Sequence, residues 1–95
     1  MTVYAIAQGR IDNREQFDAY LAAAGPTFAG HDVKILASDE TPDVVEGEVP
    51  YPRTVIIQFD SAATFYRWYD SPEYQAARRL RETASVGTFI LVQGF

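Results

Sequence analysis

The chain has 95 residues, a net charge of −5 and no cysteine. A chain of this length makes one domain, which we expect to span residues 1–95. An acidic chain without a basic face is not expected to bind nucleic acid or anionic membranes, and the lack of cysteine excludes disulfides and thiolate chemistry.

The first half of the chain predicts a strand, a helix and a second strand. Thr2–Arg10 is short and rich in β-forming residues. This stretch has no basic region followed by a long apolar run, so we expect no signal peptide and a cytoplasmic location. Asp12 and Glu15 have the spacing of a capping box, and Gly25-Pro26 ends the helix. Apolar residues recur at helical spacing at Phe17, Tyr20, Leu21 and Ala24. Asp32–Ser38 is the second predicted strand.

The second half predicts two strands around an interrupted helix. The prolines of the segment Asp39–Pro52 argue against a long regular strand there, and Arg53–Phe59 is the third main strand. Ser61 is placed to cap a helix, and Ser71-Pro72 has the pattern of a new N-cap followed by proline at the first helical position. The restarted helix is expected to run to about residue 84, and Gly87–Phe95 is the last strand.

The order β-α-β-β-α-β predicts an α+β fold of the ferredoxin-like type. Such a fold has an antiparallel sheet with helices on one face, here with the second helix broken at Ser71-Pro72. The stretches TVIIQF and TFILVQ are apolar at both odd and even positions, although a strand with one wet face should alternate. We therefore expect a homodimer in which the helix-free sheet faces meet. The alternative is that β-forming residues simply cluster in strands.

Three stretches carry a resemblance to a known family. They are YAIAQGRIDNREQFDAY near the start, Glu46-Gly47, and WYDSPEYQAARRLRE from Trp68 to Glu82. Together they resemble the domain-of-unknown-function 1330 family of the dimeric α+β barrel superfamily, over nearly the whole chain. The resemblance implies a ferredoxin-like fold and a barrel-forming dimer. It implies no particular reaction, because a fold alone is poor evidence for function.

Most polar side chains have an ordinary structural interpretation. His31, the only histidine, lies in a polar turn without a nearby nucleophile, and we expect it to be solvent-exposed rather than a general base. The acidic loop has no calcium-binding pattern and no cluster predicts a metal or cofactor site. Gln8 and Gln58 interrupt two apolar strands. We expect these strands to be parallel neighbours, so that the two amides lie at the same end of the sheet. The amides would then bind a ligand, form a hydrogen bond with each other or face water.

The candidate ligand-binding residues are Trp68, Tyr69, Tyr74 and Arg81. The helical angles place Phe65, Tyr66 and Tyr69 on the apolar face of the first helix segment and Trp68 on its flank. Arg81 borders the apolar face of the next helix, whereas Arg78 is placed to pair with Glu82. Aromatic walls and one guanidinium suit a planar or anionic organic ligand. The alternative is a packed aromatic corner, with Arg81 bonded to a carboxylate such as Glu46 or to carbonyl groups.

The sequence favours a small dimeric binding protein without covalent chemistry, because no nucleophile or acid–base pair is evident. The alternative is a cofactor-independent monooxygenase or isomerase of the same superfamily. There Tyr69, Tyr74 or His31 would transfer protons and Arg81 would hold an anionic oxygen. A weaker alternative is haem handling, for which His31 would be the only histidine ligand.

Overall fold

The computed structural model describes all residues from Met1 to Phe95. Its elements follow the predicted order β-α-β-β-α-β, with the second helix divided. The four strands are β1 (Val3–Ile11), β2 (Val33–Asp39), β3 (Arg53–Phe59) and β4 (Ser85–Gln93). The helices are α1 (Arg14–Ala24), the 3-10 helix η1 (Gly25–Phe28), α2 (Ala62–Tyr69) and α3 (Pro72–Ala84). The predicted ferredoxin-like α+β fold is confirmed.

The four strands form one antiparallel sheet in the order β2-β3-β1-β4. The expectation that the first and third strands are parallel neighbours is wrong, because β3 returns from β2 through a hairpin-like loop and so runs against β1. Gln8 lies opposite Thr54 and donates a hydrogen bond to its hydroxyl at 3.4 Å, whereas Gln58 lies opposite Tyr4. The two glutamine amides are therefore at opposite ends of the strand pair.

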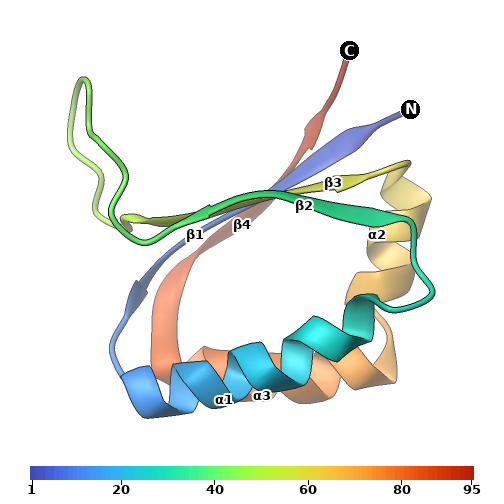
Figure 1. Cartoon of the computed structure of the whole chain (residues 1–95), viewed down its shortest axis with the longest axis horizontal. Coiled ribbons are helices and arrows are strands. Elements are labelled where there is room, and N and C mark those ends of the chain that lie inside the picture. The colour runs from blue at the N-terminus through green and yellow to red at the C-terminus, as the bar shows by residue number, and fades with distance from the viewer.

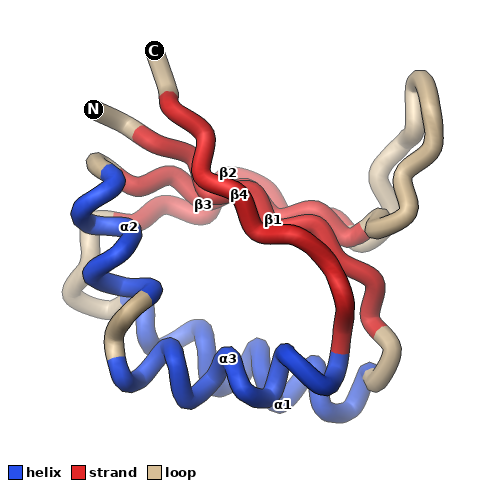
Figure 2. Tube along the Cα trace, turned by 180° about the vertical axis from the view of Figure 1, so that it is seen from behind, coloured by secondary structure: helices blue, strands red, loops and turns tan.

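All helices lie on one side of the sheet (Figure 1). Helices α1 and α3 run side by side and pack mainly against each other, and α2 stands across one end of the space between them and the sheet (Figure 2). The start of α1 is tied to the end of α3, because the backbone N–H groups of Asp12 and Asn13 both donate to the carbonyl oxygen of Ala84. None of the helices combines the length and apolar character that a bilayer crossing requires.

The helix starts follow local capping chemistry. Asn13, not Asp12, caps α1, because its side chain accepts from the backbone N–H of Gln16 and leaves Asp12 to pair with Arg10 at 2.9 Å. Ser71 caps α3 and accepts from the backbone N–H of Tyr74, with Pro72 at the first helical position. The predicted helix restart is thus confirmed.

The buried face of α2 is rotated from its predicted position. Trp68 is only 1% exposed and Tyr66 is 52% exposed, so the prediction of Trp68 as a flank residue and Tyr66 as a central one was wrong. The reason is that η1 covers this end of α2. Phe28 stacks on the Trp68 ring at 4.7 Å, and the indole Nε1 donates to the Thr27 hydroxyl at 2.9 Å.

The opposite face of the sheet is open. Its central apolar side chains are Tyr4, Ile6 and Ile56, with Ile90 and Val92 on β4, and Ile90 is 54% exposed. Residues 40–52, between β2 and β3, rise from the sheet on this helix-free side (Figure 1). The open face explains why β3 and β4 are apolar at both parities: one parity faces the helices and the other has no cover within the chain.

Candidate functional site

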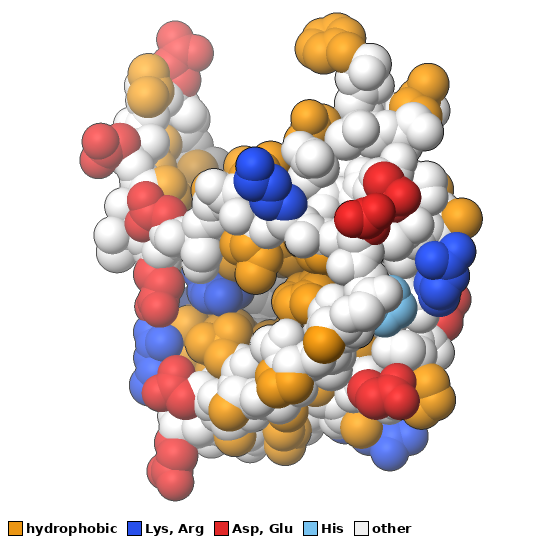
Figure 3. Space-filling model, turned by 45° about the vertical axis from the view of Figure 1, so that its right-hand side comes forward, with side chains coloured by type: hydrophobic (Ala, Val, Ile, Leu, Met, Phe, Trp, Pro, Cys, Tyr) orange, Lys and Arg blue, Asp and Glu red, His pale blue; other side chains and the backbone are white.

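A cavity of about 560 Å³ lies between the sheet and helices α1 and α3. From outside, hydrophobic side chains and a basic side chain surround a hollow between the strands and the helices (Figure 3). The volume falls in the range of about 300–1,000 Å³ that is typical of small-molecule sites. The cavity occupies the end of this space opposite α2.

Small residues on the sheet keep this end hollow. The residues of β1 that face the helices shrink along the strand, from Val3 through Ala5 and Ala7 to Gly9. On β4, Gly87 lies opposite Gly9, and a Cβ atom there would meet the carbonyl oxygen of Gln8 at 2.0 Å. No larger residue fits at position 87 without a shift of the backbone. Neither β1 at Gly9 nor β4 at Gly87 therefore places a side chain in the space between the sheet and the helices.

The walls are mainly apolar and partly aromatic. Aromatic rings come from α1, η1, α2 and β4, and aliphatic side chains come from the sheet and α1: Phe17, Tyr20, Phe28, Trp68, Phe89, Ile11, Leu21, Ile35, Val55 and Ile57. A flat organic molecule therefore finds stacking partners on several sides.

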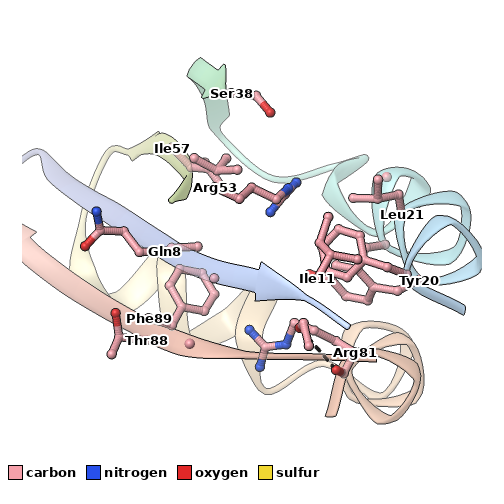
Figure 4. A pocket seen from close by; sticks show the side chains of 18 of the residues that line it. Gln8, Ile11, Tyr20, Leu21, Ser38, Arg53, Ile57, Arg81, Thr88 and Phe89 are labelled. Carbon is pink, nitrogen blue, oxygen red and sulfur yellow. Dashed lines mark hydrogen bonds between the residues drawn. The ribbon is translucent and has the colours of Figure 1, made fainter. Parts of the chain in front are cut away.

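Arg53 brings one guanidinium group into the cavity (Figure 4). It is the first residue of β3 and has the same parity as Val55 and Ile57, so it occupies an inward-facing position. Its Cζ atom lies 4.7 Å from the centre of the Phe17 ring. Burial lowers the pKa of the Arg53 guanidinium from its ordinary value.

Arg81 brings the second guanidinium group from α3. It continues the inward stripe of Tyr74, Ala77 and Ala84 at helical spacing, a stripe whose other members are fully or almost fully buried. Its Cζ atom lies 6.0 Å from the Tyr20 ring centre and 5.8 Å from that of Phe89. The side chain thus reaches from the helix layer towards β4.

Neither guanidinium group has an acidic partner within the chain. The four salt bridges of the structure use the guanidinium groups of Arg10, Arg14 and Arg78. The one carboxylate of the cavity lining, Glu82, pairs with Arg78 at 3.0 Å. The packing alternative had Arg81 bonded to a carboxylate such as Glu46 or to carbonyl groups, and the structure shows no salt bridge between Arg81 and Glu46. Two guanidinium groups without a salt bridge therefore face a mainly apolar cavity, and the Glu40 carboxylate, which pairs with Arg14, acts on Arg53 only at longer range.

A pair of phenol groups lies beside the arginines. The hydroxyl oxygens of Tyr20 and Tyr74 are 3.0 Å apart, and Tyr74 has no exposed surface. Tyr20 lines the cavity and Tyr74 supports it from behind. Burial raises the pKa of the Tyr74 phenol, so this group is neutral at physiological pH.

The structure places the four predicted ligand-binding residues at different depths. Trp68 and Arg81 line the cavity. Tyr69 and Tyr74 lie outside the lining, where Tyr69 packs 5.5 Å from the Tyr74 ring and 6.1 Å from that of Phe89. The stretch WYDSPEYQAARRLRE thus supplies three cavity residues, Trp68, Arg81 and Glu82, and two tyrosines that support cavity walls.

Sequence reasoning missed Arg53 and treated Phe17 and Tyr20 only as core. The signal for Arg53 was its parity with the apolar residues of β3, because a charged residue two positions before a buried valine shares the buried face. The signal for Tyr20 was its hydroxyl group, since a tyrosine in a buried stripe needs a hydrogen-bond partner.

His31 lies in a different, wholly polar hollow on the outside of the molecule. Its neighbours there are Gly30, Asp32, Asp60, Thr64 and Arg67. No group of three or more His, Cys, Asp or Glu side chains is arranged to hold a metal ion. His31 is not part of the cavity lining.

Comparison with known proteins agrees with the fold and names a family. The sequence model of the family described as "Domain of unknown function (DUF1330)" matches residues 2–95. None of the curated proteins is similar to this chain in sequence.

Solved structures show similar folds at low sequence identity. The protein of unknown function RPA0582 from Rhodopseudomonas palustris has a TM-score of 0.82 and 18% identity, with 99% of this chain and 82% of that chain covered. A dimeric ferredoxin-like protein of unknown function from Thermobifida fusca has a TM-score of 0.67 and 20% identity, with coverages of 99% and 90%. SnoaB, a cofactor-independent oxygenase from Streptomyces nogalater, has a TM-score of 0.68 and 10% identity, with coverages of 99% and 93%.

Proposed function

We propose that this chain, which belongs to the domain-of-unknown-function 1330 family, binds a small anionic organic molecule in the cavity between its sheet and its helices. The observation that carries the proposal is the pair of unpaired guanidinium groups, Arg53 and Arg81, in an apolar cavity of about 560 Å³. Both side chains are partly exposed, and an anion that forms charge-assisted hydrogen bonds with both guanidinium groups would bind favourably.

Charge supports an anionic rather than a cationic ligand. The whole chain carries a net charge of −5, yet the cavity lining holds two arginines and one carboxylate that is already paired. The local potential is therefore opposite in sign to the net charge. An anion would be attracted to the cavity more than to the rest of the surface.

The four candidate residues have separate roles in this proposal. Arg81 binds the anionic group, and Trp68 forms the apolar end wall. Tyr74 holds Tyr20 in place through the contact between their hydroxyl groups, and Tyr69 supports the Phe89 ring. The ligand therefore touches two of the four and depends on the other two for the shape of its site.

A thermal-shift screen of aromatic and aliphatic carboxylic acids tests the proposal. A bound acid raises the Tm of the native protein, because a ligand that binds only the folded state stabilises it. Arg81→Ala should give a clearly smaller shift, because Arg53 is then the one guanidinium group left in the cavity. Arg79→Ala is the matched control, since Arg79 lies two residues earlier on α3 and is exposed. The absence of a shift with every acid would contradict the proposal. Equal shifts in Arg81→Ala and Arg79→Ala would show that Arg81 does not contact the ligand.

The second part of the proposal is a homodimer packed through the open sheet face. It is supported by the exposed apolar side chains of this face, including Ile90 and Val92, and by the fold shared with the dimeric Thermobifida protein. Ile90→Glu should give a monomer in light scattering coupled to size exclusion. Ala76→Glu, on the exposed side of α3, should leave the dimer intact. A monomeric native protein at micromolar concentration would refute this part.

An enzyme without a cofactor is the second candidate function. The observation that favours it is the hydroxyl pair of Tyr20 and Tyr74 beside Arg81, which offers a proton donor next to a positive charge. The fold shared with the cofactor-independent oxygenase SnoaB also supports it. Mass spectrometry of an acid found by the screen, after incubation with the protein in air, separates the two functions. A binding protein returns the acid unchanged.

A further inference from the structure

The two guanidinium groups lie on different walls of the cavity. Arg53 comes from β3 and lies over Phe17, whereas Arg81 comes from α3 and lies over Tyr20 and Phe89. In the close view they are well apart, one on each side of β1 (Figure 4). Each is held against an aromatic ring of its own wall, so the two groups do not converge on one point.

The sheet order sets the scale of this separation. β1 lies between β3, which carries Arg53, and β4, which carries the Phe89 ring under Arg81. Two strands separated by a third are about 10 Å apart, because neighbouring strands are spaced at roughly 4.8 Å. The two oxygens of one carboxylate span far less than this. Because the two guanidinium groups lie on opposite sides of β1, we expect one carboxylate to satisfy one of them and to leave the other without a partner.

Both arginines occupy positions at which the fold expects apolar residues. Arg53 belongs to the inward parity of β3, and Arg81 belongs to the inward stripe of α3. Phe17 and Tyr20, the rings beside them on α1, have centres 5.4 Å apart, with their planes tilted by 51°. The cavity thus has an aromatic wall on α1, with a guanidinium group beside each of its two rings.

We infer that the ligand carries two anionic groups on a flat apolar body, one group for Arg53 and one for Arg81. Its chemical class is an aromatic or otherwise planar dicarboxylate. The inference rests on the proposed function, because it specifies the ligand of the same cavity. Each guanidinium group would form a bidentate pair with one carboxylate, which adds directional selectivity to the charge attraction.

Titration calorimetry with matched probes tests the inference. The probes are 2-naphthoate and naphthalene-2,6-dicarboxylate, with benzoate and terephthalate as a smaller pair. The native protein should bind each diacid about ten- to hundredfold more tightly than its monoacid, as expected for one further charge-assisted pair. In Arg53→Gln and in Arg81→Gln this preference should fall to nearly one. The double variant should bind neither acid. Arg79→Gln is the control and should keep the preference.

The outcomes separate the two proposals. Equal affinities for monoacid and diacid in the native protein, unchanged in Arg53→Gln, would overturn the two-anion inference and leave a one-anion site at Arg81. No binding of any of the four acids at millimolar concentration would overturn the proposed function together with the inference. Circular dichroism and the Tm of each variant establish that lost binding is not lost folding.

Discussion

The space between sheet and helices has two ends that are built differently. The end at α2 is solid: Trp68 is 1% exposed, and the rings of Phe28 and Phe59 lie 4.7 and 5.6 Å from it. The end beneath Gly9 and Gly87 is hollow, with two unpaired guanidinium groups at its walls. Trp68 and Phe28 lie at the boundary, because they pack into the solid end and also form the wall at which the cavity stops.

The difference arises from the side chains that the strands turn towards the helices. At the solid end β3 presents Phe59, which meets Phe65 of α2 edge to face at 5.2 Å. At the hollow end the same strand presents Arg53, and β1 presents Ala7 and Gly9. Burial of large rings stabilises the first end. The second end lacks that contribution, so substitutions there should affect binding more than stability.

Removing the largest ring of the solid end should have the largest effect on stability. Trp68→Ala should lower the free energy of unfolding by about 3–5 kcal/mol, because it deletes a buried indole and leaves a void. Urea denaturation at fixed protein concentration measures this loss. Tyr66→Ala, on the same helix but 52% exposed, should change stability by less than about 0.5 kcal/mol. Similar losses in both variants would mean that α2 is not the closed end of the interior.

Two alanines on β1 compare the ends directly. Ala5 has no exposed surface and lies towards the solid end, whereas Ala7, two residues later on the same face, lines the cavity. Ala5→Leu should cost about 1–3 kcal/mol through overpacking. Ala7→Leu should change the free energy of unfolding by less than about 1 kcal/mol, since the cavity accommodates the added atoms. It should also abolish the thermal shift produced by carboxylic acids.

Equal destabilisation by Ala5→Leu and Ala7→Leu would contradict the comparison. It would show that the cavity collapses around Ala7 in solution. An Ala7→Leu variant of native stability that still binds acids would place the ligand elsewhere. Ala7→Ser, which adds little volume, serves as the control for changes in polarity alone.

The fold class and the order of the elements along the chain could be predicted from the sequence. β-forming residues, the Ser71-Pro72 step and the apolar parities of β3 and β4 are local signals, and they gave the fold class. The position of Trp68 was not a local property. It depends on η1, which brings Phe28 over the indole from a distant part of the chain. Helical angles alone could not reveal that cover.

The hollow end was harder to predict because a cavity is a shortage of atoms between elements that are distant in sequence. Arg81 stood out as a charge at the edge of an apolar stripe, and it does line the cavity. Arg53 follows a proline-rich loop, and the sequence indicates only that a strand begins there. That Arg53 faces the cavity becomes clear only from the tertiary structure. There β3 pairs with β1, and the Phe17 ring of α1 lies against the Arg53 guanidinium group.

The tyrosine pair lies where the two ends meet, and its removal should have an intermediate effect. Tyr74→Phe should lower the free energy of unfolding by about 0.5–1.5 kcal/mol at neutral pH, because the hydrogen bond to Tyr20 is lost. Tyr66→Phe, at an exposed position, should have almost no effect. If Tyr74→Phe left the free energy of unfolding unchanged, water would have replaced Tyr74 as the hydrogen-bond partner of Tyr20.

Alkaline pH provides a second measurement of the same pair. The pKa of Tyr74 is raised by burial, whereas an unfolded tyrosine titrates near about 10. The unfolded state therefore loses its proton first. This contribution to stability is fully present below about pH 10 and is lost as the pH rises further, by up to about 1.4 kcal/mol per pH unit. Denaturation curves of Tyr74→Phe should show a shallower alkaline loss than those of the native protein.

The smallest expected effect on stability is at Arg81. Its guanidinium group has no carboxylate partner, so Arg81→Met removes an uncompensated charge while retaining an apolar stem. The free energy of unfolding should stay within about 0.5 kcal/mol of the native value or rise slightly. Arg78→Met is the matched control, since it breaks the salt bridge to Glu82 and should cost about 0.3–0.5 kcal/mol. With a carboxylic acid bound, Arg78→Met should be the more stable of the two variants, because it keeps the full stabilisation by ligand and Arg81→Met keeps only part of it. A loss above about 1.5 kcal/mol in Arg81→Met without ligand would make Arg81 a packing residue of the α3 stripe, and the hollow end would then be as structural as the solid one.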